Sequence, residues 1–401
     1  MRSIKSMMMG GAILLGLAMC LTSCEGTLDD IFGEWSRPSG NNDNTKTSVT
    51  SIELNKETLE LAAGETGQLT ATVDPSGTAV TWSSDKEEVA TVDANGLVTA
   101  VAAGIATITA KAGDKSATCE VTVTANPAAV PLTMEAITAG TIKVTSPQDG
   151  MQYSLNGGAK TAVTSTAIDV AVGDKVAFYG NGTSITIYSG TQITGGTAEV
   201  KVYGNIMSLV DETGFADKTE LPSTMTFYEL FSNNTKLIDA SGLLLPATTL
   251  KNYCYSLMFC GCTSLTAAPK ELPATDLTGG TSCYSSMFNG CTSLTAAPEL
   301  KATTLVKECY YKMFQGCTSL TAAPQLPATT LKNYCYEYMF DNCTNLNSVT
   351  CLATDISAAD CTKSWLSNVP GTGTFTKASG VDWSGKTGSA GIPSGWTVNE
   401  Q

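Results

Sequence analysis

The most regular pattern of apolar and polar positions lies between Phe227 and Pro370, where one segment of sequence is repeated. An apolar Met-Phe pair marks the full copies, at Met258-Phe259, Met287-Phe288, Met313-Phe314 and Met339-Phe340, and looser copies end at Phe231 and Leu366. Successive copies are 28, 29, 26, 26 and 26 residues apart. A period in the twenties is typical of a solenoid, in which each unit buries its apolar side only by stacking on its neighbours.

Each copy contains two segments of different character. The first, at 332–341 in the last full copy, has no Gly or Pro, and Cys335, Met339 and Cys343 recur at every fourth position, as on one face of a helix. A Gly or Asn342 follows, and both residue types tolerate the left-handed conformation that ends a helix. The Thr-rich segment that comes next favours a short strand. We therefore predict one short helix and one short strand per copy, with the strands of adjacent copies paired in parallel.

Alternation with a period of two dominates 49–124. Turn signals such as Asn95-Gly96 separate the expected strands, which cover Ser51–Leu54, Gln68–Val73, Val80–Ser83, Leu97–Val101, Ile105–Thr109 and Thr118–Thr124. Short strands in this number, with Trp82 inside one of them, predict a β-sandwich. Cys119 falls on the apolar side of its strand, where we expect an inert thiol.

These residues carry two resemblances. The repeated Met-Phe-x-Gly-Cys-Thr-Ser-Leu-Thr motif resembles the BspA-like leucine-rich repeats of bacterial surface proteins, especially those of Bacteroidetes. The run Trp82-Ser83-Ser84, with 96–100 (GLVTA) and 104–109 (GIATIT), is similar to the bacterial Ig-like domain of group 2, a spacer in intimin- and invasin-like adhesins. The resemblances imply a multi-domain protein: an all-β Ig-like sandwich and a second small β domain, followed by an α/β leucine-rich-repeat solenoid. Such repeats bind many different ligands, so the resemblance is less informative about function.

The predicted organisation covers the whole chain. It consists of a lipoprotein signal peptide at 1–23, a flexible tether at 24–48, the Ig-like domain at 49–124, a small β domain at 131–206, the repeats at 207–370 and a C-terminal cap at 371–401. In the small β domain, Ile168, Val170 and Val172 alternate along one expected strand. Four apolar residues of the cap are expected to cover the last repeat: Phe375, Trp383, Ile392 and Trp396.

The first residues have the layout of a secretory leader. Arg2 and Lys5 precede an apolar run, 7–21, that is short for a membrane span. The segment 21–24 (LTSC) resembles a bacterial lipobox, which implies lipid attachment at Cys24 and anchoring in the outer membrane. The alternative is an ordinary leader with a chance Cys. Acidic residues behind Cys24 resemble an export signal of surface lipoproteins, so we expect exposure at the cell surface.

Composition excludes several function classes. The chain has no His, and Arg occurs only at Arg2 and Arg37, so Ser-His-Asp and Cys-His catalysis and His-bearing zinc sites are excluded for the chain acting alone. A net charge of −14 disfavours contact with nucleic acid. Residues 380–387 (GVDWSGKT) fit the P-loop pattern, but 388–393 cannot form the helix that the pattern requires, so we expect no nucleotide binding. We expect no enzyme activity, no cofactor and no metal site.

The cysteines of the repeats fall into two columns. The first contains Cys254, Cys283, Cys309, Cys335 and Cys361, and the second, eight residues later, contains Cys262, Cys291, Cys317 and Cys343. Eight helical residues span about 12 Å, which exceeds the Cα separation of about 7 Å that a disulfide permits. We therefore favour two columns of buried thiols. Disulfides, as in many exported proteins, and metal clusters are the alternatives.

Tyrosines provide the candidate ligand contacts. Six of them lie in the segment predicted to be helical: Tyr255, Tyr284, Tyr310, Tyr311, Tyr336 and Tyr338. A Tyr offers rigid contact area and a hydroxyl group, so an exposed row would suit a protein or glycan ligand. The alternative is that these rings fill the seams between repeats. The sequence thus predicts a lipid-anchored surface protein that uses its solenoid for adhesion to, or recognition of, a host, matrix or microbial ligand. A glycan-binding accessory of a surface uptake system and a structural envelope protein are the other candidates.

Overall fold

The computed structural model describes residues 48–180, 190–388 and 391–401. Within these ranges the chain forms β-strands, short 3₁₀ turns and runs of tight turns, with no α-helix. The predicted site of lipid attachment, Cys24, lies outside the described residues. The same is true of the predicted signal peptide and of all but the last residue of the predicted tether.

The first nine strands form the sandwich that alternation predicts. They make three small sheets with the orders β2-β9-β8-β5, β3-β7-β6 and β1-β4. Their bounds are Ser51–Leu54 (β1), Thr58–Ala62 (β2), Thr66–Gln68 (β3), Ala71–Asp74 (β4), Thr81–Ser84 (β5), Ala90–Val92 (β6), Leu97–Ala100 (β7), Gly104–Ala112 (β8) and Lys115–Thr124 (β9). Cys119 is fully buried on the inner side of β9, as expected, and burial raises the pKa of its thiol. Trp82 packs against the apolar clusters of this region.

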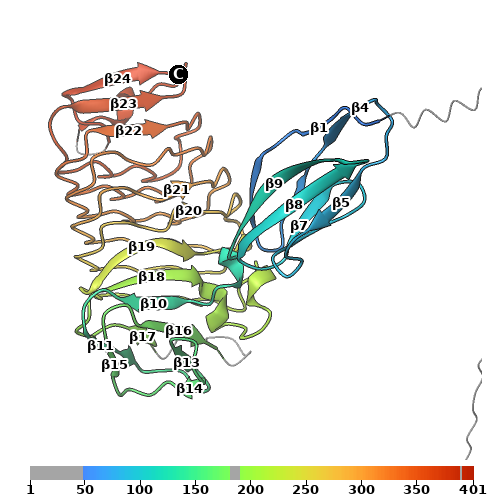
Figure 1. Ribbon diagram of the computed structural model, residues 1–401. Coiled ribbons are helices and arrows are strands. Elements are labelled where there is room, and N and C mark those ends of the chain that lie inside the picture. The colour runs from blue at the N-terminus through green and yellow to red at the C-terminus, as the bar shows by residue number, and fades with distance from the viewer. Residues whose placement is uncertain (1–47, 181–189, 389–390) are drawn as a thin grey trace, which may run out of the picture. The chain divides into compact units, whose positions relative to one another are not determined.

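The next segment, after the 3₁₀ turn η1 (Pro127–Ala129), forms a six-stranded sheet in the order β14-β13-β16-β10-β18-β19 (Figure 1). Two strand pairs, β11-β15 and β12-β17, accompany it. The bounds are Thr133–Ala136 (β10), Gly140–Ile142 (β11), Val144–Thr145 (β12), Gln152–Leu155 (β13), Thr161–Ala162 (β14), Ile168–Val170 (β15), Lys175–Tyr179 (β16), Gln192–Ile193 (β17), Val200–Asn205 (β18) and Leu237–Leu244 (β19). Val172, expected to continue the alternation of β15, is 68% exposed because the strand ends at Val170 and the chain turns.

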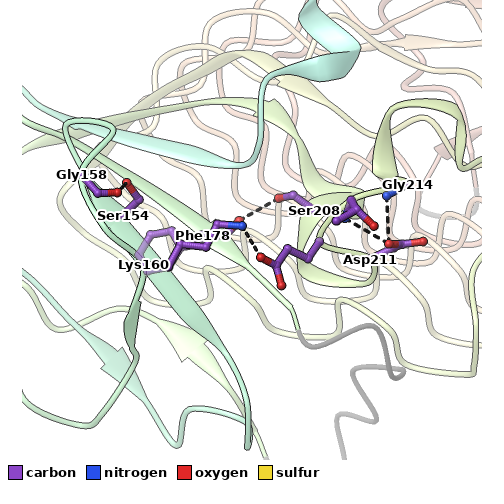
Figure 2. Close-up of polar contacts among 9 residues, drawn as sticks. Ser154, Gly158, Lys160, Phe178, Ser208, Asp211 and Gly214 are labelled. Carbon is purple, nitrogen blue, oxygen red and sulfur yellow. Dashed lines mark hydrogen bonds and ion pairs between the residues drawn. The ribbon is translucent and has the colours of Figure 1, made fainter.

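Buried polar contacts join this sheet to the segment that follows it. The Ser208 side chain, in the 3₁₀ turn η2 (Ile206–Leu209), is fully buried and donates to the Phe178 carbonyl at 2.9 Å (Figure 2). The same hydroxyl accepts from the Leu132 amide at 2.9 Å. A second 3₁₀ turn, η3 (Phe215–Asp217), follows. One apolar core runs without interruption from Leu132 to Trp396, so the sheet and the repeats fold around shared contacts.

The α/β leucine-rich-repeat solenoid predicted for 207–370 is wrong. Where helices were expected, for example at 332–341, the chain makes consecutive tight turns. Each turn places two adjacent side chains inside, such as Cys254 and Tyr255, and then Met258 and Phe259, all fully buried. The spacing of four residues that suggested a helical face therefore comes from a turn unit that is four residues long.

Backbone hydrogen bonds explain why this arrangement is stable. Alternate amides donate to the carbonyl three residues earlier, as Met258 N does to Tyr255 O at 3.3 Å. The amides between them donate to the next copy, as Phe259 N does to Met287 O at 2.8 Å. Each amide from Tyr253 to Cys262 is satisfied in one of these two ways. Because half of the bonds cross to the neighbouring copy, a single copy cannot satisfy its own backbone.

Every fourth residue of the turns is left-handed. In one copy φ is 56° at Tyr253, 59° at Leu257 and 72° at Gly261. Each of these is the third residue of a four-residue turn, closed by a hydrogen bond from the fourth residue's amide to the first residue's carbonyl. A type II turn requires a positive φ at this third position. The left-handed conformation predicted for the Gly column and Asn342 is confirmed, with φ between 61° and 76°. These residues continue a series of turns and do not cap a helix.

The other side of each copy pairs in parallel with its neighbours, as predicted, but the strands are short. Isolated bridges join Asp239 to Ala267 and Ala267 to Ala296. The strands are Glu271–Leu272 (β20), Glu299–Leu300 (β21), Ser348–Cys351 (β22), Gly373–Lys377 (β23) and Trp396–Glu400 (β24). The four apolar cap residues are buried, as predicted, and Trp383 stacks on Trp365 with ring centroids 5.9 Å apart. The segment 380–387 that fits the P-loop pattern contains the 3₁₀ turn η4 (Ser384–Lys386).

Candidate functional site

Four of the six candidate tyrosines form a column inside the core. These rings, the tyrosine column, belong to Tyr255, Tyr284, Tyr310 and Tyr336, and each is at most 2% exposed. Neighbouring rings are nearly parallel or moderately tilted, with centroids 5.6, 5.7 and 6.0 Å apart. Burial raises the pKa of every one of these hydroxyls well above its ordinary value. These side chains pack between copies, which was the alternative interpretation, and a ligand cannot reach them without opening the core.

The other two candidates, Tyr311 and Tyr338, lie on the outer side of the turns. Their rings meet edge to face, with centroids 6.2 Å apart and an angle of 87°. The Lys312 ammonium lies 5.1 Å from the Tyr311 ring centroid and 5.4 Å from that of Tyr338. All three side chains are half-buried. We call these three residues the tyrosine–lysine ridge. A cation within about 6 Å of two ring centroids is attracted to both rings.

Charged groups around the ridge are nearly balanced. Lys363 Nζ lies 3.3 Å from a carboxylate oxygen of Glu337, whose side chain is only 9% exposed, and 3.9 Å from Asp360. These carboxylates raise the pKa of Lys363, chiefly through the hydrogen bond from its ammonium to Glu337. Nearby, Lys307 pairs with Glu308 at 3.1 Å. Because the charges occur in pairs, the surface does not select strongly for either sign of ligand.

A row of side-chain amides runs beside the ridge and ends in a carboxylate. The Asn289 amide group donates to Gln315 Oε1 at 2.9 Å, and Gln315 Nε2 donates to Asp341 Oδ2 at 2.7 Å. Asp341, 7% exposed, also accepts from Asn342 and Asn368. The row fixes the orientation of polar groups along the outer side of the stack. An ordered polar surface of this kind loses little conformational entropy on binding.

The cysteines have no reactive surroundings. All twelve that the structure describes are free, and eleven are buried. Thiols of the second column donate to carbonyls of earlier copies, as Cys291 does to Phe259 O at 3.1 Å. Burial raises the pKa of Cys254 and of Cys262 to about 12, so neither is a thiolate at neutral pH. Across the described ranges, no group of three or more acidic or thiol side chains is placed to hold a metal ion.

Comparison with known families adds one assignment. Residues 48–123 match the family model described as "Bacterial Ig-like domain (group 2)". This region is a bacterial Ig-like domain. Its limits agree with the sandwich of β1 to β9, and the match ends before the repeats begin.

Two curated proteins are similar to short parts of the chain. A lacto-N-biosidase of Bifidobacterium bifidum is 54% identical over 69 residues, which are 16% of this chain and 6% of that protein. An uncharacterized protein of Clostridium acetobutylicum is 42% identical over 82 residues, which are 19% of this chain and 8% of that protein. The chain thus spans less than a tenth of the length of these relatives.

Two solved structures of the S-layer protein SbsC align with parts of the chain. Its domains 5–6 align at 16% identity and a TM-score of 0.18, covering 32% of this chain and 84% of that one. Its domains 1–6 align at 18% identity and the same TM-score, covering 38% and 25%. Alignments at this TM-score do not establish the fold of any part of the chain. Separately, the residues that the structure describes include no helix long and apolar enough to cross a membrane.

The sequence contains a signal that separates the two sets of tyrosines. A Tyr stands three residues before the Met in all four full copies, and these are the buried rings. Tyr311 and Tyr338 occupy positions at which the other copies have unrelated residues. Rings needed by the stack recur in every copy, whereas those outside it vary.

Proposed function

We propose that this protein works at the cell surface as a binding protein. In this proposal the bacterial Ig-like domain is a spacer, and the stacked copies at 225–370 carry the recognition surface. The protein is held by a lipid on Cys24 in the outer membrane and has no catalytic role, cofactor or nucleic acid partner. The ligand is a host, matrix or microbial protein or glycan.

The tyrosine–lysine ridge is the observation that carries this proposal. Tyr311 and Tyr338 have half-buried rings that the core does not need, since other rings fill the core beneath them. Tyr is enriched at binding hot spots because it combines a rigid apolar surface with a hydroxyl. The Ig-like domain supports the surface location, since the resemblance noted above is to spacers of adhesins.

Protease treatment of intact cells tests the location. We expect protease treatment to remove the segment 225–370, detected with an antibody, from intact cells. The segment would survive this treatment if the protein were periplasmic. A Cys24→Ala variant is expected to lose incorporation of a labelled fatty acid. Survival of the segment under conditions that remove a known surface protein would refute surface display and favour a structural protein of the envelope.

Variants of the ridge test the recognition surface. A ligand is first captured from host-cell and matrix extracts with the native protein. The double variant Tyr311→Ala/Tyr338→Ala is expected to bind this ligand with at least tenfold lower affinity. The matched control is Tyr253→Ala, because Tyr253 is an exposed ring on the same side of the turns but outside the ridge. Equal binding by the double variant and the control would exclude the ridge.

A further inference from the structure

A row of alternating charges crosses four neighbouring strands of the six-stranded sheet. Glu135 on β10 is the register partner of Lys175 on β16 and of Lys201 on β18, and Lys201 is the partner of Asp239 on β19. The neighbouring side chains Met134, Val176 and Val202 point into the core. Because strand side chains alternate, the charged row lies on the opposite, outer face of the sheet. The four strands lie side by side in Figure 1.

The row is neutral overall and is tightly organised. Lys201 Nζ lies 3.1 Å from Glu135 Oε1, and the two side chains are 39% and 18% exposed. Tyr203, two residues along β18 on the same face, lies near Glu135. Burial and this carboxylate both raise the pKa of Tyr203, burial most. Two ammonium groups, two carboxylates and a phenol thus offer donors and acceptors in alternation.

An irregularity in β19 shapes the space beside the row. Between Lys201 and Tyr203 the pairing with β19 shifts by one residue, so that Tyr203 is opposite Gly242. A Cβ at Gly242 would lie 2.7 Å from the Tyr203 Cβ, so only Gly allows the ring to approach β19. The Ser241 amide donates to Asp239 Oδ1 at 2.7 Å and orients that carboxylate. Strand irregularities often redirect side chains next to binding sites.

Two adjoining hollows open at this place. The first, about 460 Å³, is lined by the charged row with Tyr203, Ser241 and Gly242. The second, also about 460 Å³, shares Ser241 and Gly242 with the first, and its lining is mainly apolar, with Leu244, Pro246 and Pro273. Each falls within the range of about 300–1,000 Å³ that is usual for small-ligand sites.

We propose that the two hollows form one binding site for a neutral oligosaccharide. A sugar hydroxyl both donates and accepts, so adjacent hydroxyls can pair with a carboxylate and an ammonium of the row at the same time. The C–H face of a pyranose ring suits the Tyr203 ring and the apolar second hollow. The extent of the two hollows together favours at least two sugar units. This site is separate from the tyrosine–lysine ridge, and the proposal does not depend on it.

Charge balance argues against ionic ligands. Two lysines and two acids line the first hollow, so an anion gains from Lys175 and Lys201 but is repelled by Glu135 and Asp239. A cation meets the reverse arrangement. A neutral ligand with many hydroxyls satisfies all four groups without either cost.

The experiment uses the full chain and an array of oligosaccharides of two to six units, some neutral and some containing uronic acids. Neutral compounds that bind are then titrated by calorimetry. Ser241→Trp fills the shared part of the hollows from a half-buried position, and Ser293→Trp is the matched control, a half-buried Ser within the repeats. Asp239→Asn removes one acceptor charge while preserving shape. Thermal unfolding of each variant reports whether the fold is retained.

We expect neutral oligosaccharides to bind the native chain, to lose detectable binding to Ser241→Trp and to bind Asp239→Asn at least fivefold more weakly. Ser293→Trp and the ridge double variant are expected to bind like the native chain. Absence of binding to any neutral oligosaccharide, preference for uronic acids, or unchanged binding by a folded Ser241→Trp variant would overturn the proposal. Loss of binding in the ridge double variant alone would place the glycan site at the ridge and would likewise overturn it, while leaving the proposed function intact.

Discussion

Two adjacent serines allow a direct test of the turn architecture. Ser286 is left-handed, with φ of 55°, whereas Ser285 is not among the residues with a positive φ. Both side chains are half-buried. In a helix, replacement of either Ser by Gly would be destabilising. In the turn architecture the two replacements differ in sign.

The magnitudes follow from the backbone. A left-handed conformation costs a residue with a Cβ about 1–2 kcal/mol, and Gly avoids this cost but loses about 0.5–1 kcal/mol through its greater freedom in the unfolded chain. Ser286→Gly should therefore stabilise the protein by about 0.5–1 kcal/mol. Ser285→Gly gains nothing, loses a weak 3.4 Å hydrogen bond to the Tyr311 carbonyl, and should destabilise it by about 0.5–1 kcal/mol. Ser286→Ile should be the least stable of the three, because β-branched residues are the least tolerant of a positive φ.

The assay is equilibrium unfolding of Ser286→Gly and Ser285→Gly in urea. If the free energy of unfolding depends on urea concentration with the same slope in both variants, the urea concentrations at the midpoints report the difference in stability. Circular dichroism of the folded proteins checks that the variants retain the native structure. If Ser286→Gly is destabilised as much as Ser285→Gly, the left-handed period of four residues is wrong and a helix at this position regains support.

Two further predictions concern the core and the effect of pH. Phe288 is fully buried and stacks between Phe259 and Phe314, with ring centroids 5.2 and 5.5 Å away. Phe288→Ala should therefore lower the free energy of unfolding in urea by about 3–5 kcal/mol. A decrease below about 1 kcal/mol would contradict the stacked column. The amides of Gly214 and Thr213 and the ammonium of Lys218, with the Gly214 contact foremost, lower the pKa of Asp211 from 3.8 to about 2. The stability that this carboxylate contributes is therefore present above pH 3.8 and lost as pH falls toward 2. We expect the Asp211→Asn variant to be less stable than the native chain at pH 7, by a difference that shrinks between pH 4 and 2. A difference in stability that does not change with pH would contradict this prediction.

The Ig-like domain was predictable because its signals are local. Strand alternation and turn residues located β5, β7, β8 and β9 to within a few residues, and β1 has the predicted bounds. The strands β2 and β6 were not among those expected, and the single expected strand Gln68–Val73 is divided between β3 and β4, which belong to different sheets. Cys119 could be placed inside from its neighbours alone, since one face of a strand is fixed by a period of two. At Val172 the same reasoning failed, because a strand end depends on the following turn and not on the alternation.

The predicted helices failed for a different reason. A helix advances by about 100° per residue, so residues at a strict spacing of four drift by about 40° at each step. Cys254, Met258 and Cys262 keep that spacing over eight residues, and Tyr255 and Phe259 accompany them as second members of buried pairs. Pairs of inward residues separated by two outward ones fit a helix only over one turn. The period of four therefore contained the evidence against a helix, but recognising it required knowledge that the amides pair alternately within and between copies.

The repetition within the chain also separates structure from function. The Cys, Tyr, Met and Phe columns, which are the same in every full copy, lie inside the stack, where each side chain must fit the identical residue above and below it. A Thr column is also the same in every full copy but lies at the surface, at Thr263, Thr292, Thr318 and Thr344. One outward position reads Ser256, Ser285, Tyr311, Glu337 and Lys363 in successive copies. The Thr column links neighbouring copies, as Thr292 Oγ1 does by donating to Thr263 O at 3.2 Å, whereas Tyr311 and Glu337 at the varying position have no identical neighbour to fit. Under the proposed function, exchange of the ridge residues Tyr311 and Tyr338 with those of another copy should move the binding site along the stack without altering the core.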